Sequence, residues 1–459
     1  MAGLNTTLDI AKNTLLTSQA LVSISSNNIS NADNASYARQ TGVVTTNPSY
    51  RSNSVLLGMG SSLDKVTQSR DQLIERQLHK SLSQESEYTT LYNRLDQVAS
   101  VLEDDGESGL STVLGEFWDA WDTLNQNDGT SERIGVYEAA SNLAQSITDL
   151  HDNLTDLVDS FTSEISDTVD SVNGLLQKIS DYNDQIVHME SSGTTANDLR
   201  DLRYQALSDL SDIVSFSYNE EDNGAITIKM GDETLVDGSP PSVSKLKFEQ
   251  DNNESTFTIS VAGGGEVASY TDAFPYTTVI GDHEVQYQED FSGSLKGMLE
   301  ALADTSSYID MLDSFKANLV SEVNAAYSGS KNPAENVFST DSGYITVDSG
   351  FTQDSIDAAT ALDVSDVQGT GLDALGGSTL GDYLSAIQEQ FGTDQSYASS
   401  QSEFKTSLRE ELESQQQSVS GVSIDEETVN ILKYQQMYQA ASKLVSITSE
   451  MMDTLIQMV

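Results

Sequence analysis

Apolar side chains recur at alternating steps of four and three residues through the C-terminal stretch 421–459. On an α-helix this spacing collects them into one broad stripe along a single face. The start is well marked, because Ser423 and Glu426 match a capping box and Gly421 interrupts the chain just before them. The pattern therefore predicts one long amphipathic helix. Its stripe includes Ile431, Tyr434, Met437, Tyr438, Leu444, Val445, Met451, Met452, Leu455 and Ile456.

The beginning of the chain, from about residue 4 to residue 31, repeats this spacing. Leu8, Leu15, Val22 and Ile29 recur every seven residues on one predicted helical face. An isolated helix of this length does not recover the conformational entropy lost on folding, so each stripe needs a partner that covers it. The two ends of the chain therefore predict a helix pair. The same pattern is also typical of two core helices that close a globular domain.

Between these ends the pattern predicts helices with one inserted β segment. Helices are expected at about 63–105, 110–121, 132–214 with a soft break at Gly193, 292–327 and 382–418. Strands are expected at 225–230, 256–261, 284–287 and 344–347. Phe117, Trp118 and Trp121 share a helical face, which is more typical of a core than of a ligand site.

The fold class predicted from these elements is mainly α with inserted β, in a nested multidomain rod protein. Paired terminal coiled-coil helices would occupy residues 1–60 and 419–459. A helical-bundle middle domain would comprise 61–214 and 291–418, and a small outer β domain would comprise 215–290. Nesting of this kind suits stacked layers along a rod.

Charge is distributed unevenly along the chain, whose formal net charge is −50. The first 60 residues and the stretch 421–459 are close to neutral, so almost all of the negative charge lies between them. Nearly neutral ends can pack against copies of themselves, whereas the acidic middle repels other copies and belongs in solvent. An acidic surface suited to a salty habitat explains the middle equally well. Either way, nucleic acid and anionic membranes are poor partners.

Candidate chemistry is sparse. The chain has no cysteine, and its four histidines, His79, His151, His188 and His283, lie in unrelated contexts. Tyr287 stands where a zinc-protease motif beginning at His283 needs its second histidine, and no phosphate-binding or nucleophile motif is complete. We therefore expect no enzymatic activity, no catalytic residues, no metal site and no cofactor. No apolar run approaches the length of a membrane span, and the N-terminus lacks the features of a cleavable signal peptide.

Segments at both ends resemble the signatures of bacterial flagellar axial proteins. Residues 26–32, which include Asn27 and Asn28, and residues 37–40 are similar to the N-terminal signature. Residues 420–427, 432–436 and 438–440 are similar to the C-terminal one.

The bend after the first helix departs from this family pattern. Ala35 and Ser36 stand where the family usually has Pro-Gly, so Asn31, Asp33 and Asn34 are expected to form the bend instead.

Within the family, the proteins that join the hook to the filament are the most similar at 110–121 and 172–213. The resemblance implies an extracellular structural component of the flagellum at this junction, exported through the flagellum's own type III channel without a cleavable signal peptide. Implied partners are identical subunits in a ring, the hook protein, the second junction protein and a cytosolic export chaperone on the C-terminal helix. The terminal helices would be mostly disordered in the free chain and would fold on assembly. The expected assembly interface combines the C-terminal stripe with Leu8, Leu15, Val22, Asn27, Asn28 and Ile29.

Two alternatives remain open from the sequence. One is another axial protein, such as a hook, rod or second junction protein, because these share the amphipathic ends. The other is a secreted adhesin or enzyme in which the β segment binds glycans or proteins and the helices form a stalk.

Overall fold

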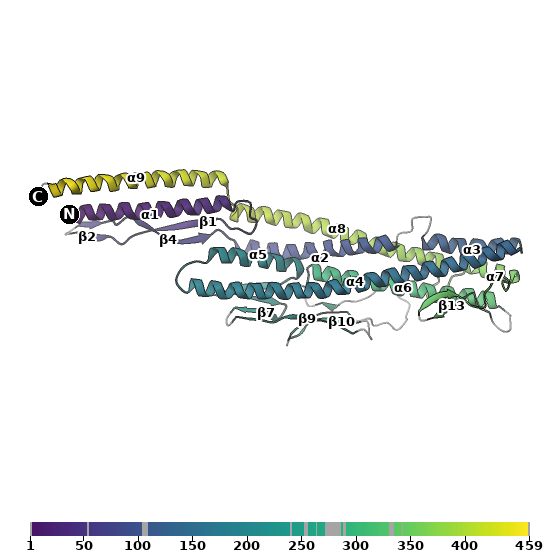
Figure 1. Ribbon diagram of the computed structural model, residues 1–459. Helices are drawn as coiled ribbons and strands as arrows, with labels where there is room; N and C mark the ends of the chain where they lie inside the picture. The colour runs from purple at the N-terminus through teal and green to yellow at the C-terminus, as the bar shows by residue number, and fades with distance from the viewer. Residues whose placement is uncertain are drawn as a thin grey trace. The chain divides into compact units, whose positions relative to one another are not determined.

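The computed structural model describes residues 2–52, 55–102, 109–238, 241–251, 256–262, 264–270, 286–287, 291–329, 335–341 and 343–457, and helices dominate this part of the chain (Figure 1). The helices are α1 (Ala2–Ser30), α2 (Gln72–Leu102), α3 (Leu110–Gln126), α4 (Thr130–Glu190), α5 (Asn197–Ile213), α6 (Ser294–Ser328), α7 (Ala361–Ser365), α8 (Leu380–Ser420) and α9 (Ile424–Gln457). Short 3₁₀ helices lie at Ala358–Thr360, Asp366–Gly369 and Asp373–Leu375. The predicted fold class, mainly α with inserted β, is confirmed.

The strands are short and pair only with antiparallel neighbours in the described ranges. They are β1 (Gln40–Thr46), β2 (Tyr50–Ser52), β3 (Val55–Leu57), β4 (Ser61–Gln68), β5 (Ser217–Glu220), β6 (Ile226–Met230), β7 (Glu233–Gly238), β8 (Pro241–Val243), β9 (Leu246–Asp251), β10 (Thr256–Val261), β11 (Glu266–Tyr270), β12 (Gln286–Tyr287), β13 (Phe338–Asp341) and β14 (Tyr344–Val347). The first half of the strand predicted at 284–287 lies outside the described residues.

The chain forms two compact units. The terminal unit comprises Met1–Leu82, Asn173–Lys245 and Thr406–Val459. The middle unit comprises Ser83–Val172 and Leu246–Lys405. These units differ from the predicted three-part division, which stays a prediction.

The segment predicted as one β domain, 215–290, contributes a different sheet to each unit. The order β5-β6-β7-β8 forms a four-stranded sheet in the terminal unit, whereas β12-β11-β10-β9 forms one in the middle unit. Buried polar contacts explain where the first sheet belongs, because Arg203 Nη1 donates to Asn183 Oδ1 (3.0 Å) and to the Gly224 carbonyl (2.7 Å). These bonds attach the start of β6 to α4 and α5.

The helix predicted at 63–105 begins later than expected. Residues 63–68 belong to β4, which pairs with β1 from Gln40↔Gln68 to Thr46↔Ser61. Asp71 then caps α2, since its Oδ1 accepts from the Leu73 N–H (2.8 Å). The absence of Gly and Pro from 63–105 was therefore a poor guide to the helix start, because strand pairing competes for the same residues.

Three helical asparagines each bind the first residue of a strand in the same way. Asn28 Nδ2 donates to the Gln40 carbonyl (2.9 Å) while its Oδ1 accepts from the Gln40 N–H (2.9 Å). Asn183 bonds both groups of Ile226 at 2.8 and 3.1 Å. Asn324 bonds both groups of Phe338 at 2.8 and 3.0 Å. Each side-chain amide thus satisfies backbone groups that would otherwise be left unpaired at the start of a strand.

A buried histidine lies in the core of the terminal unit. His79 on α2 packs against the rings of Phe216 and Tyr218, at centroid distances of 6.0 and 5.9 Å. Burial, aided by the positive charge of Arg70, lowers the pKa of His79 to about 4. The folded terminal unit therefore holds this imidazole in its neutral form.

We expect acid to destabilise the terminal unit through His79. Between pH 6.5 and about 4, the unfolded chain takes up a proton on His79 and the folded chain does not, so the free energy of unfolding falls as pH decreases. In His79→Phe this loss between pH 7 and pH 5 should shrink by roughly 1–2 kcal/mol, as measured by urea unfolding. Replacing the exposed His188 with Phe is the control. Equal pH dependence in both variants would contradict the prediction.

The core of the middle unit confirms the predicted aromatic cluster. Trp121 is fully buried, with ring centroids 5.8 Å from Tyr327 and 6.2 Å from Phe351. Phe117 lies 4.8 Å from Trp118 and is also buried. These side chains fasten α3 to α6 and to the loop after β14.

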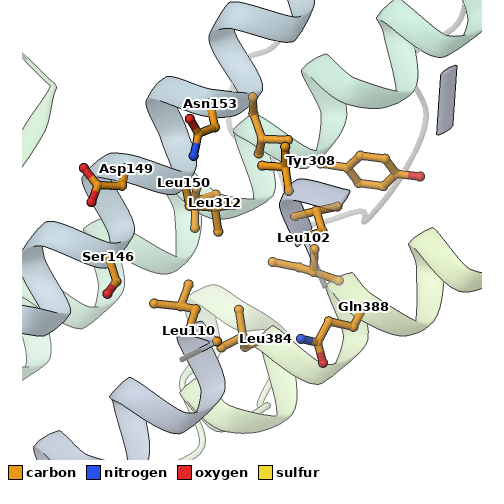
Figure 2. Close-up of a pocket in the computed structure, with 14 residues that line it drawn as sticks. Leu102, Leu110, Ser146, Asp149, Leu150, Asn153, Tyr308, Leu312, Leu384 and Gln388 are labelled. Atoms are coloured by element: carbon orange, nitrogen blue, oxygen red, sulfur yellow. The ribbon is translucent and has the colours of Figure 1, made fainter. Parts of the chain in front are cut away.

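A cavity of about 310 Å³ opens between helices of the middle unit (Figure 2). Its apolar walls include Leu102, Leu110, Leu150, Leu312 and Leu384. Its polar walls are formed by Ser146, Asp149, Asn153 and Gln388. Asp149 is the one carboxylate among its described lining residues, and no histidine, lysine or arginine faces it there. Its described titratable lining residues are Asp149 and Tyr308.

Carboxyl groups from two helices meet elsewhere in the middle unit. Asp304 and Glu300 on α6 lie near Asp394 on α8, which accepts a hydrogen bond from Tyr308 Oη (2.7 Å). Burial, together with the negative charges of Asp394 and Glu300, raises the pKa of Asp304 to about 8. The folded chain therefore holds a proton on Asp304 at neutral pH.

We expect Asp304→Asn to stabilise the middle unit at alkaline pH. From its usual pKa of 3.8 up to about 8, the unfolded chain releases the Asp304 proton while the folded chain keeps it. The free energy of unfolding therefore falls as pH rises through this range. The amide should raise it by roughly 1–3 kcal/mol at pH 8 and by less at pH 5, measured by urea unfolding. Asp310→Asn, at an exposed position of the same helix, is the control, and an equal gain there would contradict the prediction.

Candidate assembly surface

Helices α1 and α9 lie side by side in the terminal unit, with the two chain ends at the same end of the pair (Figure 1). They are therefore antiparallel. The buried positions are mostly small: Ala11, Ser18 and Ser25 on α1, and Ala441 and Thr448 on α9. Small side chains let two helix backbones approach closely. The predicted pairing of the terminal helices is present within one chain.

The beginning of α9 is held by an ion pair between the half-buried Arg39 and the buried Glu427. Arg39 Nε and Nη2 both lie 2.8 Å from Glu427 Oε1, and Arg39 Nη1 lies 3.3 Å from Glu426 Oε2. Burial alone would raise the pKa of Glu427, but hydrogen bonds from Ser25 and Arg39 and the Arg39 charge outweigh burial and lower it. The Ser423 hydroxyl accepts from the Glu426 N–H (3.4 Å), as the predicted capping box requires. Glu427 is therefore a buried carboxylate at neutral pH.

Asn28 was predicted at the assembly interface, but the structure assigns it an internal role. Its side chain is fully buried, and its Oδ1 accepts from Tyr37 Oη (2.8 Å) in addition to the Gln40 N–H. An amide whose atoms are bonded inside its own chain is not available to a neighbour. Asn27, on the outer side of the same turn, is exposed.

The bend after α1 is formed by the residues that the sequence indicated. The Asn34 N–H donates to the Asn31 carbonyl (3.0 Å), and Asn34 Oδ1 accepts from the Ser36 N–H (3.2 Å). Asp33 lies within this turn. Asparagine side chains therefore replace the Pro-Gly turn of the family pattern.

A row of large apolar side chains on α9 remains exposed beside the α1 contact. We call this the exposed α9 row: Met437, Leu444, Ile447, Met451 and Leu455. Their exposed fractions lie between 37% and 52%. Because they recur every three, four or seven residues, they lie on one helical face. Within the described chain, α1 thus covers only part of the apolar stripe.

The other predicted interface residues fall into two groups. Those beside the helix contact are half-buried: Leu8, Leu15, Val22, Ile29, Ile431, Tyr434, Val445 and Met452. Tyr438 and Ile456 are exposed on the opposite flank of α9. Their role at an interface stays a prediction.

On the described parts of the terminal helices, sequence reasoning missed five exposed apolar residues: Leu16, Ile424, Val429, Leu432 and Ile447. These residues lie off the two rows of alternating four and three residues, so the spacing pattern did not include them. Ile447 is three residues after Leu444 and four before Met451, so its helical spacing could have placed it in the row.

The described residues contain no helix that is both long and apolar enough to span a membrane. Nor do histidines and carboxylates gather there in a group of three that could hold a metal ion.

Comparison with known proteins identifies the family. A family model described as the flagellar hook-associated protein FlgK helical domain matches residues 95–331, more than half of the chain. The chain belongs to the FlgK family. A second model, described as the flagellar basal body rod FlgEFG protein C-terminal region, matches residues 414–458, which contain all of α9. The resemblance to flagellar axial proteins is thus confirmed.

Curated FlgK relatives align at modest identity. Flagellar hook-associated protein 1 of Bacillus subtilis is 26% identical over 98% of this chain and 97% of its own length. The protein of the same name from Salmonella typhimurium is 30% identical, over 48% of this chain and 40% of its own length. A solved structure of the flagellar hook junction protein FlgK from Burkholderia pseudomallei is 22% identical and covers 58% of this chain and 47% of that one, with a TM-score of 0.47. Proteins of the FlgK family are structural components of the flagellum, and so is this chain.

Proposed function

We propose that this chain joins the hook to the filament and that the exposed α9 row packs against other axial subunits. The observation that carries the proposal is the row itself. In a chain of net charge −50, five large apolar side chains stay exposed along a regular helix. Contiguous exposed apolar surface in a soluble protein marks an interaction site.

Identical subunits are the first partners of this surface. The half-buried side chains at the α1–α9 contact, such as Leu15 and Val445, continue the apolar surface around the helix pair. Neighbouring copies in a ring would cover both flanks of the pair, while the acidic middle of each copy stays apart. The hook protein below and the second junction protein above would complete the contacts along the axis.

Before assembly the same row needs protection. A cytosolic export chaperone that binds α9 would cover Leu444 and Met451 until the chain leaves the cell. Chaperone and neighbouring subunits would then compete for one surface. The chain would be exported through the flagellar channel without a cleavable signal peptide and would reside outside the cell at the hook–filament junction.

Folding of the terminal helices is expected to be coupled to assembly. One α1–α9 pair buries mainly small side chains, such as Ala11 and Ala441, and leaves the large ones of the row in water. Small side chains return little free energy on burial, so neighbouring subunits would supply the rest. Circular dichroism of the free chain tests this. Helicity as high as in the fully folded chain would count against coupled folding.

The location of the chain tests the proposal directly. Hooks purified from cells can be imaged after labelling with an antibody against the middle unit. Label at the distal end of the hook is expected, between hook and filament. Label spread along the filament or confined to the hook shaft would overturn the assignment and favour another axial protein.

A further inference from the structure

The buried rows of α1 and α9 repeat in a way that permits slippage. On α1 the row is Ala11, Ser18 and Ser25, and on α9 it includes Ala441 and Thr448, with seven residues between successive members. A shift of seven residues that places Thr448 opposite Ala11 moves α9 about 10 Å and again sets small side chains opposite small ones, since Ala441 then faces Ser18. Packing at the centre of the contact therefore discriminates weakly between registers.

Glu427 is the exception in this repeating row. It lies fourteen residues before Ala441 on the same face, yet it is a carboxylate only 2% exposed. In the observed register it meets Ser25, which donates a hydrogen bond to it, as do Arg39 and Asn28. Because the pair is antiparallel, two steps of seven residues lead backward from Ser25 to Ala11 on α1 and forward from Glu427 to Ala441 on α9. Ala11 and Ala441 therefore face each other.

Arg39 is itself anchored through its backbone. Its N–H donates to the Ser420 carbonyl at the end of α8 (2.9 Å), and its carbonyl accepts from the Ser69 N–H just after β4 (2.9 Å). The backbone of Arg39, from which the side chain extends, is therefore held in place beside the helix pair.

We infer that Arg39 is a positioning residue that, by pairing with Glu427, sets the register of α9 along α1. In the register that places Thr448 opposite Ala11, Glu427 would move about 10 Å, past Ser30 at the end of α1, and would lose its hydrogen bonds from Ser25 and Arg39. Loss of a charged pair that holds a buried carboxylate is strongly unfavourable, and a single buried polar group is known to fix register in paired helices. The register in turn sets where the exposed α9 row is presented to neighbours. This last consequence rests on the proposed function, whereas the register does not.

Disulfide trapping reports directly which residues of α1 and α9 face each other. The chain has no cysteine of its own that would compete with an introduced pair. One double variant, Ala11→Cys with Ala441→Cys, reports the observed register. A second, Ala11→Cys with Thr448→Cys, reports the register shifted by seven. After mild oxidation of the full-length chain, the first should form its intrachain disulfide and the second should not, as resolved by mass spectrometry. Failure of the first pair, or equal yields from both, would overturn the inference.

Glu427→Leu added to each pair is the decisive variant. It removes the buried charge and keeps an apolar side chain, so α9 still docks while the reason for one register is gone. We expect the ratio of observed to shifted disulfide to fall by at least about tenfold. A ratio unchanged from the parent chain would mean that packing sets the register, and the inference would fail.

Arg39 is tested with a matched control. Arg39→Met should also lower the yield of the Ala11–Ala441 reporter, and Arg39→Lys, which keeps the charge, should restore part of it. Arg51→Met removes the same charge from an exposed position in β2 and should change nothing. Equal behaviour of Arg39→Met and Arg51→Met would overturn the role of Arg39.

Filament retention separates this inference from the proposed function. If Glu427→Leu loosens the register but cells keep their filaments, the register stands and its link to assembly falls. If the register stays single in every variant while charges in the exposed α9 row abolish filaments, the proposed function stands and the inference falls.

Discussion

Replacing Leu444 with aspartate is expected to leave the free chain folded and to abolish its incorporation into the flagellum. Leu444 is 46% exposed, so in the free chain the new carboxylate stays hydrated and the free energy of unfolding should change by less than about 1 kcal/mol. In a packed assembly the same charge would be buried without a partner, at a cost of several kcal/mol. Cells that carry the variant should therefore export filament protein without retaining filaments.

The matched control is Ser446→Asp. Ser446 is exposed on the same helix, two residues further on, and its position points away from the exposed α9 row. It receives the same charge and should support filaments normally. Motility assays and electron microscopy of the two strains give the comparison, with circular dichroism of the purified chains as the check on folding. Normal motility of the Leu444→Asp strain would refute the assembly role of the row.

The second large effect is expected at Asn28. In Asn28→Asp the side chain no longer donates to the Gln40 carbonyl, and a second carboxylate is buried beside Glu427. Removal of one partner from a buried polar network costs about 3–5 kcal/mol, so the terminal unit should unfold at markedly lower urea concentration. Protonation of the new carboxyl should relieve part of this loss in acid.

Asn27→Asp provides the comparison in the adjacent residue. Asn27 is exposed, and its Oδ1 already accepts a hydrogen bond from Asn31 Nδ2 (3.0 Å), which a carboxylate can also accept. Its substitution should change the free energy of unfolding by no more than about 0.5 kcal/mol. Urea unfolding and limited proteolysis of α9 measure both variants. Equal losses in the two would contradict the internal role of Asn28.

Helical elements of this chain could be predicted because their signals are local. The stripe of α9, its cap at Ser423 and the break at Gly421 follow from side chains within a few residues of one another. The aromatic face of α3 and the asparagine turn after α1 are local in the same sense. These features need no knowledge of what the rest of the chain does.

Features that depend on distant partners could not be predicted in this way. Residues 63–68 become a strand because β1 lies beside them, and the 215–290 segment divides because Asn183 and Arg203 bind the beginning of β6. The two asparagines of the N-terminal signature look equivalent in the sequence. Only the position of Gln40 and Tyr37 in space decides that Asn28 is internal while Asn27 faces solvent.

The asparagines that begin three strands have a consequence for how such chains diversify. The separations between amide and strand are 12, 43 and 14 residues for Asn28, Asn183 and Asn324. The same attachment point therefore tolerates connections of very different length. Insertions upstream of β1, β6 or β13 would lengthen a loop without displacing the strand that follows, so related proteins can change their connecting segments while their helical framework is preserved.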